Sequence, residues 1–199
     1  MNQQNTPIQM QLAEALRYTP LKELKWSKIA LLVPITQQSG RRGSRVYYRD
    51  GSYDDAAYIV STLLRQLARY HFTSVEHARA LTKSCPWVKK ERMLNMLLGD
   101  MCTVVPVIAR ESTPDSSERL GYLVKQYLYS TEALPHGTRI KFAADHAGIV
   151  IAQHEPTVRR QLMEAELLEQ HYKDLLAEQR RKLLEQEAAE QNGQIGRYK

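Results

Sequence analysis

The sequence has few cysteines and no long apolar segment. Its 199 residues include two cysteines, Cys85 and Cys102, which have neither the C-x-x-C spacing nor a second pair. Neither a zinc site nor a disulfide framework is therefore expected, and we predict two buried thiols. No apolar run approaches the roughly 20 residues that a membrane helix needs, so no membrane partner is expected.

The motifs of common targeting signals and enzymes are also missing. The start "MNQQNTPIQMQ" has neither a basic nor an apolar region of an export signal, which favours a cytoplasmic protein. There is no glycine-rich phosphate loop and no G-x-S-x-G, and the six histidines do not fit H-E-x-x-H. We therefore predict a protein that is not an enzyme, with no catalytic residue, no cofactor and no bound metal.

Positive charge is concentrated in one part of the chain. The formal net charge is +6, and residues 41–92 hold 11 Lys and Arg against 5 Asp and Glu. Residues 155–199 hold 8 against 9. Such clustering attracts polyanions, although a soluble surface or an acidic protein partner explains it equally well.

The first part of the chain favours strands and then changes to a helical period. "SKIALLVPI" predicts a strand, and "GSRVYYRDGSYDD" predicts a β-rich run that turns at Asp50-Gly51, a dipeptide typical of hairpins. A helix is predicted from Asp54 to about Tyr70. Asp54 and Asp55 stand at the end where the helix dipole favours acids.

Further helices are predicted directly after the first. Thr73 or Ser74 can cap the second helix, and Thr73 with Glu76 fits the capping-box pattern. Ser84-Cys85-Pro86 marks another start. Gly99 is placed to end a third short helix over "WVKKERMLNMLL".

The middle of the chain predicts antiparallel sheet. The β-forming segments "MCTVVPVIA", "LGYLVKQYLY", "TRIKF" and "GIVIA" are separated by polar stretches such as "RESTPDSSE" and "TEALPHG". Beyond Pro156 a leucine stripe predicts a long helix to about Glu190. The expected fold is α+β: mainly antiparallel sheet, with a helical pair or triplet inserted after the first hairpin and a long C-terminal helix.

Four parts of the chain are expected. They are a polar N-terminal segment (1–25), an α+β core with the DNA-binding surface (26–155), the long helix (156–190) and a flexible tail (191–199). The long helix either packs on its own domain or forms a short dimer contact, since Glu169 and Gln179 interrupt a regular heptad.

Three groups of cationic side chains are candidates for contact with phosphate. Guanidinium groups fit phosphate geometry, and an arginine-rich loop can enter a narrow minor groove. A charged sheet edge is the simpler explanation of the hairpin arginines. The predicted DNA-binding residues are Arg41, Arg42 and Arg45 beside the first hairpin, Arg65, Arg69, Arg79 and Lys83 on the helices, and Lys89 and Lys90 downstream.

The two helices joined by "YHFTS" also fit a helix-turn-helix. The second helix, Ser74 to Ser84, would then present Glu76, His77, Arg79 and Lys83 to bases. The turn lacks the glycine often found there, and helical hairpins are common in proteins that bind no DNA.

Several blocks of the sequence resemble the ComK family of competence transcription factors. In that family a strand of the type I-A-x-L-x-P precedes a stretch of the type R-x-x-R-F-F-G-S-S-Y-x-G-R-x-x-G-T. Here Ile29-Ala30-Leu31-Leu32-Val33-Pro34 precedes "RQLARYHFTSVEHARALTK", where Arg69, Tyr70, Phe72, Ser74, Arg79 and Thr82 fall near the family's Arg, aromatic, aromatic, Ser, Arg and Thr. "LGYLVKQYLY" and "IKFAADHAGIVIAQHEPTVRRQL", with Gln161, are similar to later segments of the family.

The resemblance covers most of Lys28 to Tyr172 and implies a function. It implies a cytoplasmic bacterial activator of competence and transformation that binds AT-rich promoter DNA through the minor groove, as dimers in pairs. The partners that it implies are double-stranded DNA, RNA polymerase and a proteolytic adaptor with a Clp ATPase.

Two other functions stay open from the residues. One is a non-enzymatic protein interaction module that works through its C-terminal helix. The other is an RNA-binding protein in which Tyr47, Tyr48 and Tyr70 stack on bases.

Overall fold

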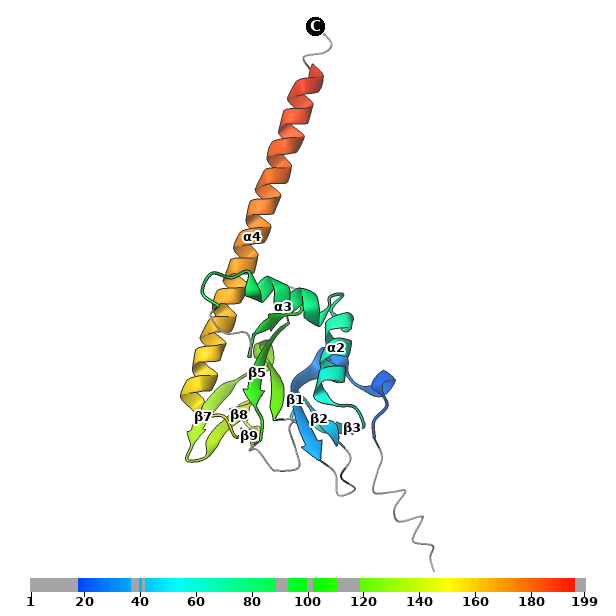
Figure 1. The fold of residues 1–199 in the computed structure, drawn as a ribbon, viewed down its shortest axis with the longest axis vertical. Helices are drawn as coiled ribbons and strands as arrows, with labels where there is room; N and C mark the ends of the chain where they lie inside the picture. The colour runs from blue at the N-terminus through cyan, green and yellow to red at the C-terminus, as the bar shows by residue number, and fades with distance from the viewer. Residues whose placement is uncertain are drawn as a thin grey trace, which may run out of the picture.

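Over the residues that the structure describes, the fold consists of two antiparallel sheets, two short helices and one long helix (Figure 1). The computed structural model describes residues 18–36, 40, 42–88, 93–99, 102–110 and 119–195, with side chains as far as residue 187. The predicted α+β class is confirmed. The strands are β1 (Ile29–Thr36), β2 (Arg42–Tyr48), β3 (Tyr53–Ala56), β4 (Met96–Leu97), β5 (Thr103–Ile108), β6 (Leu120–Val124), β7 (Ser130–Leu134), β8 (Gly137–Lys141) and β9 (Ile149–Ile151). The helices are α2 (Val60–Tyr70), α3 (Val75–Lys83) and α4 (Glu155–Ile195), with 3₁₀ turns η1 (Leu21–Glu23), η2 (Trp26–Lys28) and η3 (Lys125–Tyr127).

The larger sheet has six strands in the order β3-β2-β1-β6-β5-β4, and the smaller sheet has the order β7-β8-β9. All neighbouring strands pair antiparallel. β1 lies near the middle of the larger sheet and is apolar throughout most of its length because both of its faces are covered. β7 falls in the stretch "TEALPHG" that we expected to be a polar connection. As an edge strand with no buried residue it lacks an apolar pattern.

The β2–β3 connection is the tight turn that Asp50-Gly51 predicts. Gly51 has a φ of +81°, a conformation that glycine adopts without a steric penalty. Asp50 accepts hydrogen bonds from the hydroxyl and the backbone N–H of Ser52, which lower the pKa of Asp50. The ring of His146 packs over Gly51, so any side chain at position 51 would collide with it. This contact links the hairpin to the loop before β9.

The first helix begins later than the sequence predicts. α2 starts at Val60, and Asp54 and Asp55 lie in β3 instead of in a first helical turn. The Tyr48 hydroxyl donates a hydrogen bond to Asp54 (2.6 Å), and Arg45 donates two to Asp55 (2.7 and 2.9 Å). Partners on the neighbouring strand therefore hold both acids in the sheet, and this pairing overrides the preference of acids for a helix start.

The second helix begins at one of the two residues that were predicted as its N-cap. Ser74 is the N-cap of α3, and its hydroxyl oxygen accepts a hydrogen bond from the His77 N–H (3.0 Å). The capping-box prediction for Thr73 and Glu76 is wrong, because the cap lies one residue further along.

The prediction of a third helix is also wrong for residues 84–88 and 93–99, which are the parts of this region that the structure describes. Met96–Leu97 form strand β4, which pairs with β5. Residues 94–98 are all buried. A short run that is buried throughout and apolar apart from Asn95 carries no period that separates a strand from a helix.

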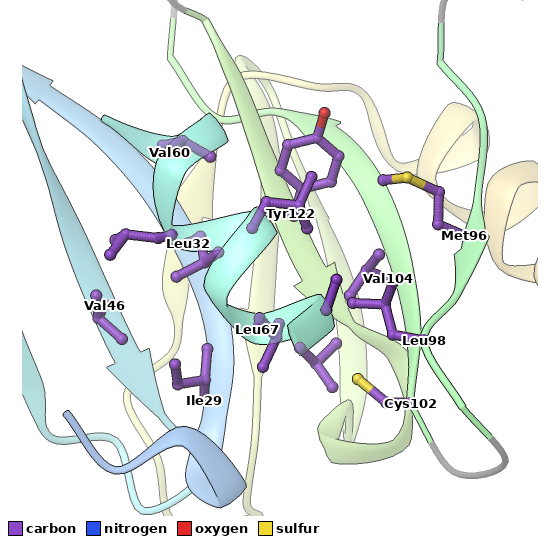
Figure 2. Close-up of a cluster of buried hydrophobic side chains, with 14 of the residues drawn as sticks. Ile29, Leu32, Val46, Val60, Leu67, Met96, Leu98, Cys102, Val104 and Tyr122 are labelled. Carbon is purple, nitrogen blue, oxygen red and sulfur yellow. The ribbon is translucent and has the colours of Figure 1, made fainter. Parts of the chain in front are cut away.

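One face of the larger sheet is covered by α2 and α3. Figure 2 shows Leu67 of α2 lying over the sheet residues Ile29 and Leu32, in a cluster that also holds Val104. Cys102 belongs to this cluster and is 2% exposed, and Cys85 is 3% exposed in a small cluster beside α4. The prediction of two buried thiols is confirmed.

The opposite face of the larger sheet packs on the smaller sheet and on the first part of α4. Leu31 and Leu123 meet Ile140 of β8, together with Val158 and Ala165 of α4. The larger sheet is therefore the middle layer of the molecule.

α4 packs on the domain along its first part and projects from it along the rest (Figure 1). Leu168 is 1% exposed, whereas every side chain from Leu176 to Glu187 is exposed. The helix continues past Glu190, where we expected it to end, and reaches Ile195.

The predicted end segments are described only in part. Residues 1–17 of the N-terminal segment and residues 196–199 of the tail lie outside the described residues. Leu24, within the segment expected to be polar, is buried in the core below α2. Among the described helices, none has the length and apolar character that crossing a membrane requires.

Candidate nucleic-acid interface

The structure describes six of the nine predicted phosphate-binding residues. Arg41, Lys89 and Lys90 lie outside the described residues. The other six occupy three places: the layer formed by α2 and α3, the β2–β3 pair, and the start of β2.

Arg65 and Arg69 point away from the protein. They lie four residues apart on α2, whose opposite side buries Leu63, Leu64 and Leu67 against the sheet. Both arginines are exposed, and neither side chain has an interaction with another described residue. α2 therefore presents two guanidinium groups to solvent, one helical turn apart, with their donors available to a ligand.

α3 adds Arg79 and Lys83 to the same side of the larger sheet, and both side chains are exposed. Arg79 also reaches the phenol of Tyr122. Burial raises the pKa of Tyr122, and Arg79 partly opposes this rise because it stabilises the phenolate. Glu76 and His77 are exposed as well, as the helix-turn-helix interpretation requires.

Arg45 lies on the opposite face of the larger sheet from α2 and α3. Its neighbour Val46 is buried below α2, and successive side chains of a strand alternate between faces. The Arg45 guanidinium binds both carboxylate oxygens of Asp55 and lies 4.3 Å from the centre of the Tyr53 ring. The hydrogen bonds to Asp55 raise the pKa of Arg45 further, although burial acts against them. The structure thus does not bring Arg45 together with Arg65 and Arg69.

Arg42 is exposed at the start of β2, opposite Thr36 in the β1–β2 register. The Arg110 guanidinium, just after β5, donates a hydrogen bond to the Thr36 hydroxyl (3.0 Å). Arg110 therefore joins Arg42 at this end of the sheet. The sequence gives no signal for this, since 74 residues separate Arg110 from Thr36 and only the strand order brings them together.

Phe72 is a surface feature that the sequence analysis named in the family resemblance but did not select as a site residue. It lies in the turn between α2 and α3, and its side chain is 99% exposed. Among the described residues it is the one non-glycine with a positive φ, +57°. The signal was a bulky apolar residue in a short helical connection where glycine is typical.

The three tyrosines proposed for RNA stacking do not form one surface. Tyr47 and Tyr48 alternate between the two faces of β2, and Tyr48 is 1% exposed. Tyr70 is 46% exposed at the end of α2, with its ring edge-on to His71. No continuous stacking platform results from these three rings.

Two hollows lie along α4. One has a volume of about 390 Å³ and is bordered by Trp87, Asn95 and Arg160. The other, of about 380 Å³, is bordered by Lys125 and Glu169, whose charged atoms lie 2.8 Å apart. Within the described ranges, no three His, Cys, Asp or Glu side chains gather closely enough to hold a metal ion.

Comparison with known proteins identifies no relative of this chain. No protein-family model, curated protein or solved structure matches this chain. The arguments for function therefore rest on the residues and their geometry.

Proposed function

We propose that this protein is a non-enzymatic transcriptional regulator that binds duplex DNA through the outer surface of α2 and α3. The observation that carries the proposal is the placement of Arg65 and Arg69, whose side chains face solvent at one-turn spacing without a partner among the described residues. Arg79 and Lys83 extend the cationic surface onto α3. The ComK-like blocks of the sequence support the same function and suggest a cytoplasmic activator of competence genes.

The mechanism of binding would be electrostatic. Lysine and arginine side chains that neutralise phosphates release condensed counterions, and this release supplies affinity without sequence preference. Preference for AT-rich DNA would come from its narrow minor groove, where the negative potential attracts arginine. Arg42 and Arg110 at the end of the sheet are candidates for such a contact.

A titration at several salt concentrations tests the proposal. The full chain is titrated with an AT-rich duplex, a GC-rich duplex of equal length and a single-stranded RNA. We expect tightest binding to the AT-rich duplex. In the Arg65→Ala/Arg69→Ala variant, the slope of log affinity against log salt should become shallower by about 0.9 for each phosphate that the variant no longer neutralises.

The matched control removes the same charge from the other side of the larger sheet. Arg139 and Arg160 each form a surface ion pair there, with Glu132 and Glu164. The Arg139→Ala/Arg160→Ala variant should keep the wild-type salt slope. Binding that does not depend on salt, or an equal effect of both double variants, would contradict a DNA surface on α2 and α3. Preference for the RNA would favour the RNA-binding alternative.

A second candidate function, protein interaction, is favoured by α4. Leu176, Leu183 and Leu184 on its projecting part are 42%, 58% and 58% exposed. A helix that only needs to stay soluble would rely on ion pairs at i,i+4 spacing, such as Glu178 with Lys182. The exposed leucines therefore indicate a surface that another helix covers.

We infer that the occupant is a second copy of this chain, in antiparallel orientation. Residues 180–187 read Arg-Arg-Lys-Leu-Leu-Glu-Gln-Glu. In an antiparallel pair centred on Leu183 and Leu184, the basic triplet of each copy faces the acidic end of the other, and the leucines meet at the two-fold axis. Ile195 of one copy then lies opposite Tyr172 of the other, where α4 leaves the domain. This pairing would produce the expected homo-oligomer.

A further inference from the structure

Phe72 exposes its whole ring at the corner between two cationic helices, which is unusual for a large apolar side chain. The ring is 99% exposed, more than any other large apolar side chain in the described part of the chain. Burying it against a partner would therefore remove almost its entire surface from water. The following inference rests on the proposed binding of DNA.

The backbone holds Phe72 in a conformation that suits glycine. The Phe72 N–H donates to the Arg69 carbonyl, and the Thr73 N–H donates to the Ala68 carbonyl, both at 3.0 Å. These two bonds form a Schellman motif, whose left-handed position is usually glycine. Phe72 occupies it with a φ of +57°, which is strained for a bulky residue. Folding alone would favour glycine here, so the phenylalanine needs another explanation.

The charge around the turn indicates the kind of partner. Residues 65–83 hold four permanent cations, Arg65, Arg69, Arg79 and Lys83, and a single acid, Glu76. The residue whose carbonyl accepts the Phe72 N–H is itself Arg69. An apolar ring in the turn between two helices that carry exposed cations fits a polyanion with an apolar interior better than it fits a purely apolar protein pocket. Duplex DNA has this character, with phosphates outside and stacked bases inside.

We propose that Phe72 is a wedge that enters between two base pairs from the minor groove and bends the duplex. Apolar side chains of minor-groove proteins unstack base steps in this way, and flexible pyrimidine–purine steps such as TA open most easily. Arg65 and Arg69 hold the flanking phosphates while the ring is inserted. The wedge adds preference for flexible AT-rich steps to the electrostatic affinity of the arginines.

Three variants of the full chain test the wedge. Phe72→Gly removes the ring and relieves the backbone, so it should fold with a raised melting temperature. Phe72→Leu keeps an apolar wedge. Tyr129→Ala removes another exposed ring, 62% exposed beside β7, and is the matched control. Bending is measured by energy transfer between dyes at the two ends of an AT-rich duplex, and unstacking by the fluorescence of 2-aminopurine at a central TA step.

Wild type, Phe72→Leu and Tyr129→Ala should each bend the duplex and raise the 2-aminopurine signal. Phe72→Gly should lose both signals and bind the duplex about tenfold more weakly, with an unchanged salt slope. If Phe72→Gly bends the duplex as much as the wild type does, the wedge is overturned but the proposed DNA binding is not. Salt-dependent binding by the wild type without any bend would also overturn the wedge and leave DNA binding standing. It would point to a protein pocket for the ring. Absence of duplex binding by the wild type removes the proposed function and the wedge together.

Discussion

Arg45 and Arg65 show how neighbours decide the role of an arginine. The guanidinium of Arg45 binds Asp55 across the β2–β3 pair and stacks on Tyr53. The Arg65 side chain has no interaction with a described residue and faces solvent from α2. Both residues add one charge to the same basic segment, but only Arg65 keeps its hydrogen-bond donors available to a ligand.

Cys102 should make stability depend on pH in the alkaline range. Burial raises its pKa from 9.0 to about 11, with the Gln126 side chain acting in the opposite direction. The unfolded chain therefore loses this proton first. The contribution to the free energy of unfolding is intact below about pH 9 and is lost as the pH rises towards about 11. Between about pH 8 and about pH 10 the loss should be about 1.4 kcal/mol.

Urea unfolding of wild type and Cys102→Ala at these two pH values measures this contribution. The variant should be less stable at both values because it leaves a cavity, but its stability should fall less between them. Identical pH dependence of the two proteins would show that burial of the thiol does not control the alkaline loss.

Among the elements, α4 combines two different environments in one helix. Its first part buries Val158, Ala165 and Leu168 against the domain. The same helix face continues past the domain through Leu176 and Leu183, which are exposed. The apolar period is continuous, so the sequence does not mark the point where the domain ends.

Charge reversal tests whether two projecting helices pair. In one variant Arg180, Arg181 and Lys182 are changed to Glu, so that every charged residue from 180 to 187 is acidic. In the other, Glu185→Lys/Glu187→Lys, every charged residue in this range is basic. Each variant alone should be monomeric by light scattering because like charges face each other, and an equimolar mixture should form heterodimers. Monomers in the wild type, or dimers in both single variants, would exclude this pairing.

The orientation of the pair can be measured with the same helix. Ala177→Cys places a spin label on the projecting part, where the two buried native cysteines should not compete for the reagent. In the antiparallel pair residue 177 lies opposite residue 190, so two labels should be separated by about 20 Å along the axis. A separation of about 10 Å would indicate a parallel pair instead.

The whole molecule is held together across the larger sheet and at the base of α4. Gln153 accepts a hydrogen bond from the Ile108 N–H (2.7 Å), and its amide donates to the Gln161 side chain. The Asn95 amide donates to the Gln161 carbonyl (2.9 Å). These buried groups join β5, α4 and the segment before β4. The first part of α4 is therefore a part of the folded domain.

Truncation separates the two candidate functions. A chain that ends at Leu175 keeps every fully buried residue of α4, and it should fold, bind DNA with the wild-type salt slope and remain monomeric. A chain that ends at Glu155 should unfold, because the loss of Val158 and Leu168 alone removes roughly 3–6 kcal/mol of burial. Circular dichroism and light scattering report these outcomes. Loss of DNA binding in the folded, shorter chain would place the DNA surface on α4.

Local sequence patterns predicted the elements that have a continuous apolar run or a regular apolar period. β1, β2, α2, α3 and α4 follow from apolar runs or periods, and the β2–β3 turn follows from Asp50-Gly51. The predictions failed for β3, β4 and β7, where contacts with a neighbouring strand and not the local pattern decide the element. Asp54 and Asp55 join β3 through Tyr48 and Arg45, and β4 and β7 are too short or too exposed to show a period.

For the candidate site, the sequence determined that α2 turns Arg65 and Arg69 outward, because a 3.6-residue period places cations opposite the buried leucines. It also determined the fold class and the presence of a long C-terminal helix. Only the tertiary structure decided that Arg45 faces the other side of the sheet, that Arg110 joins Arg42, and that Phe72 stands fully exposed at the corner of two helices. These outcomes depend on strand order and on a positive φ, which arise from contacts between distant residues and not from local periodicity.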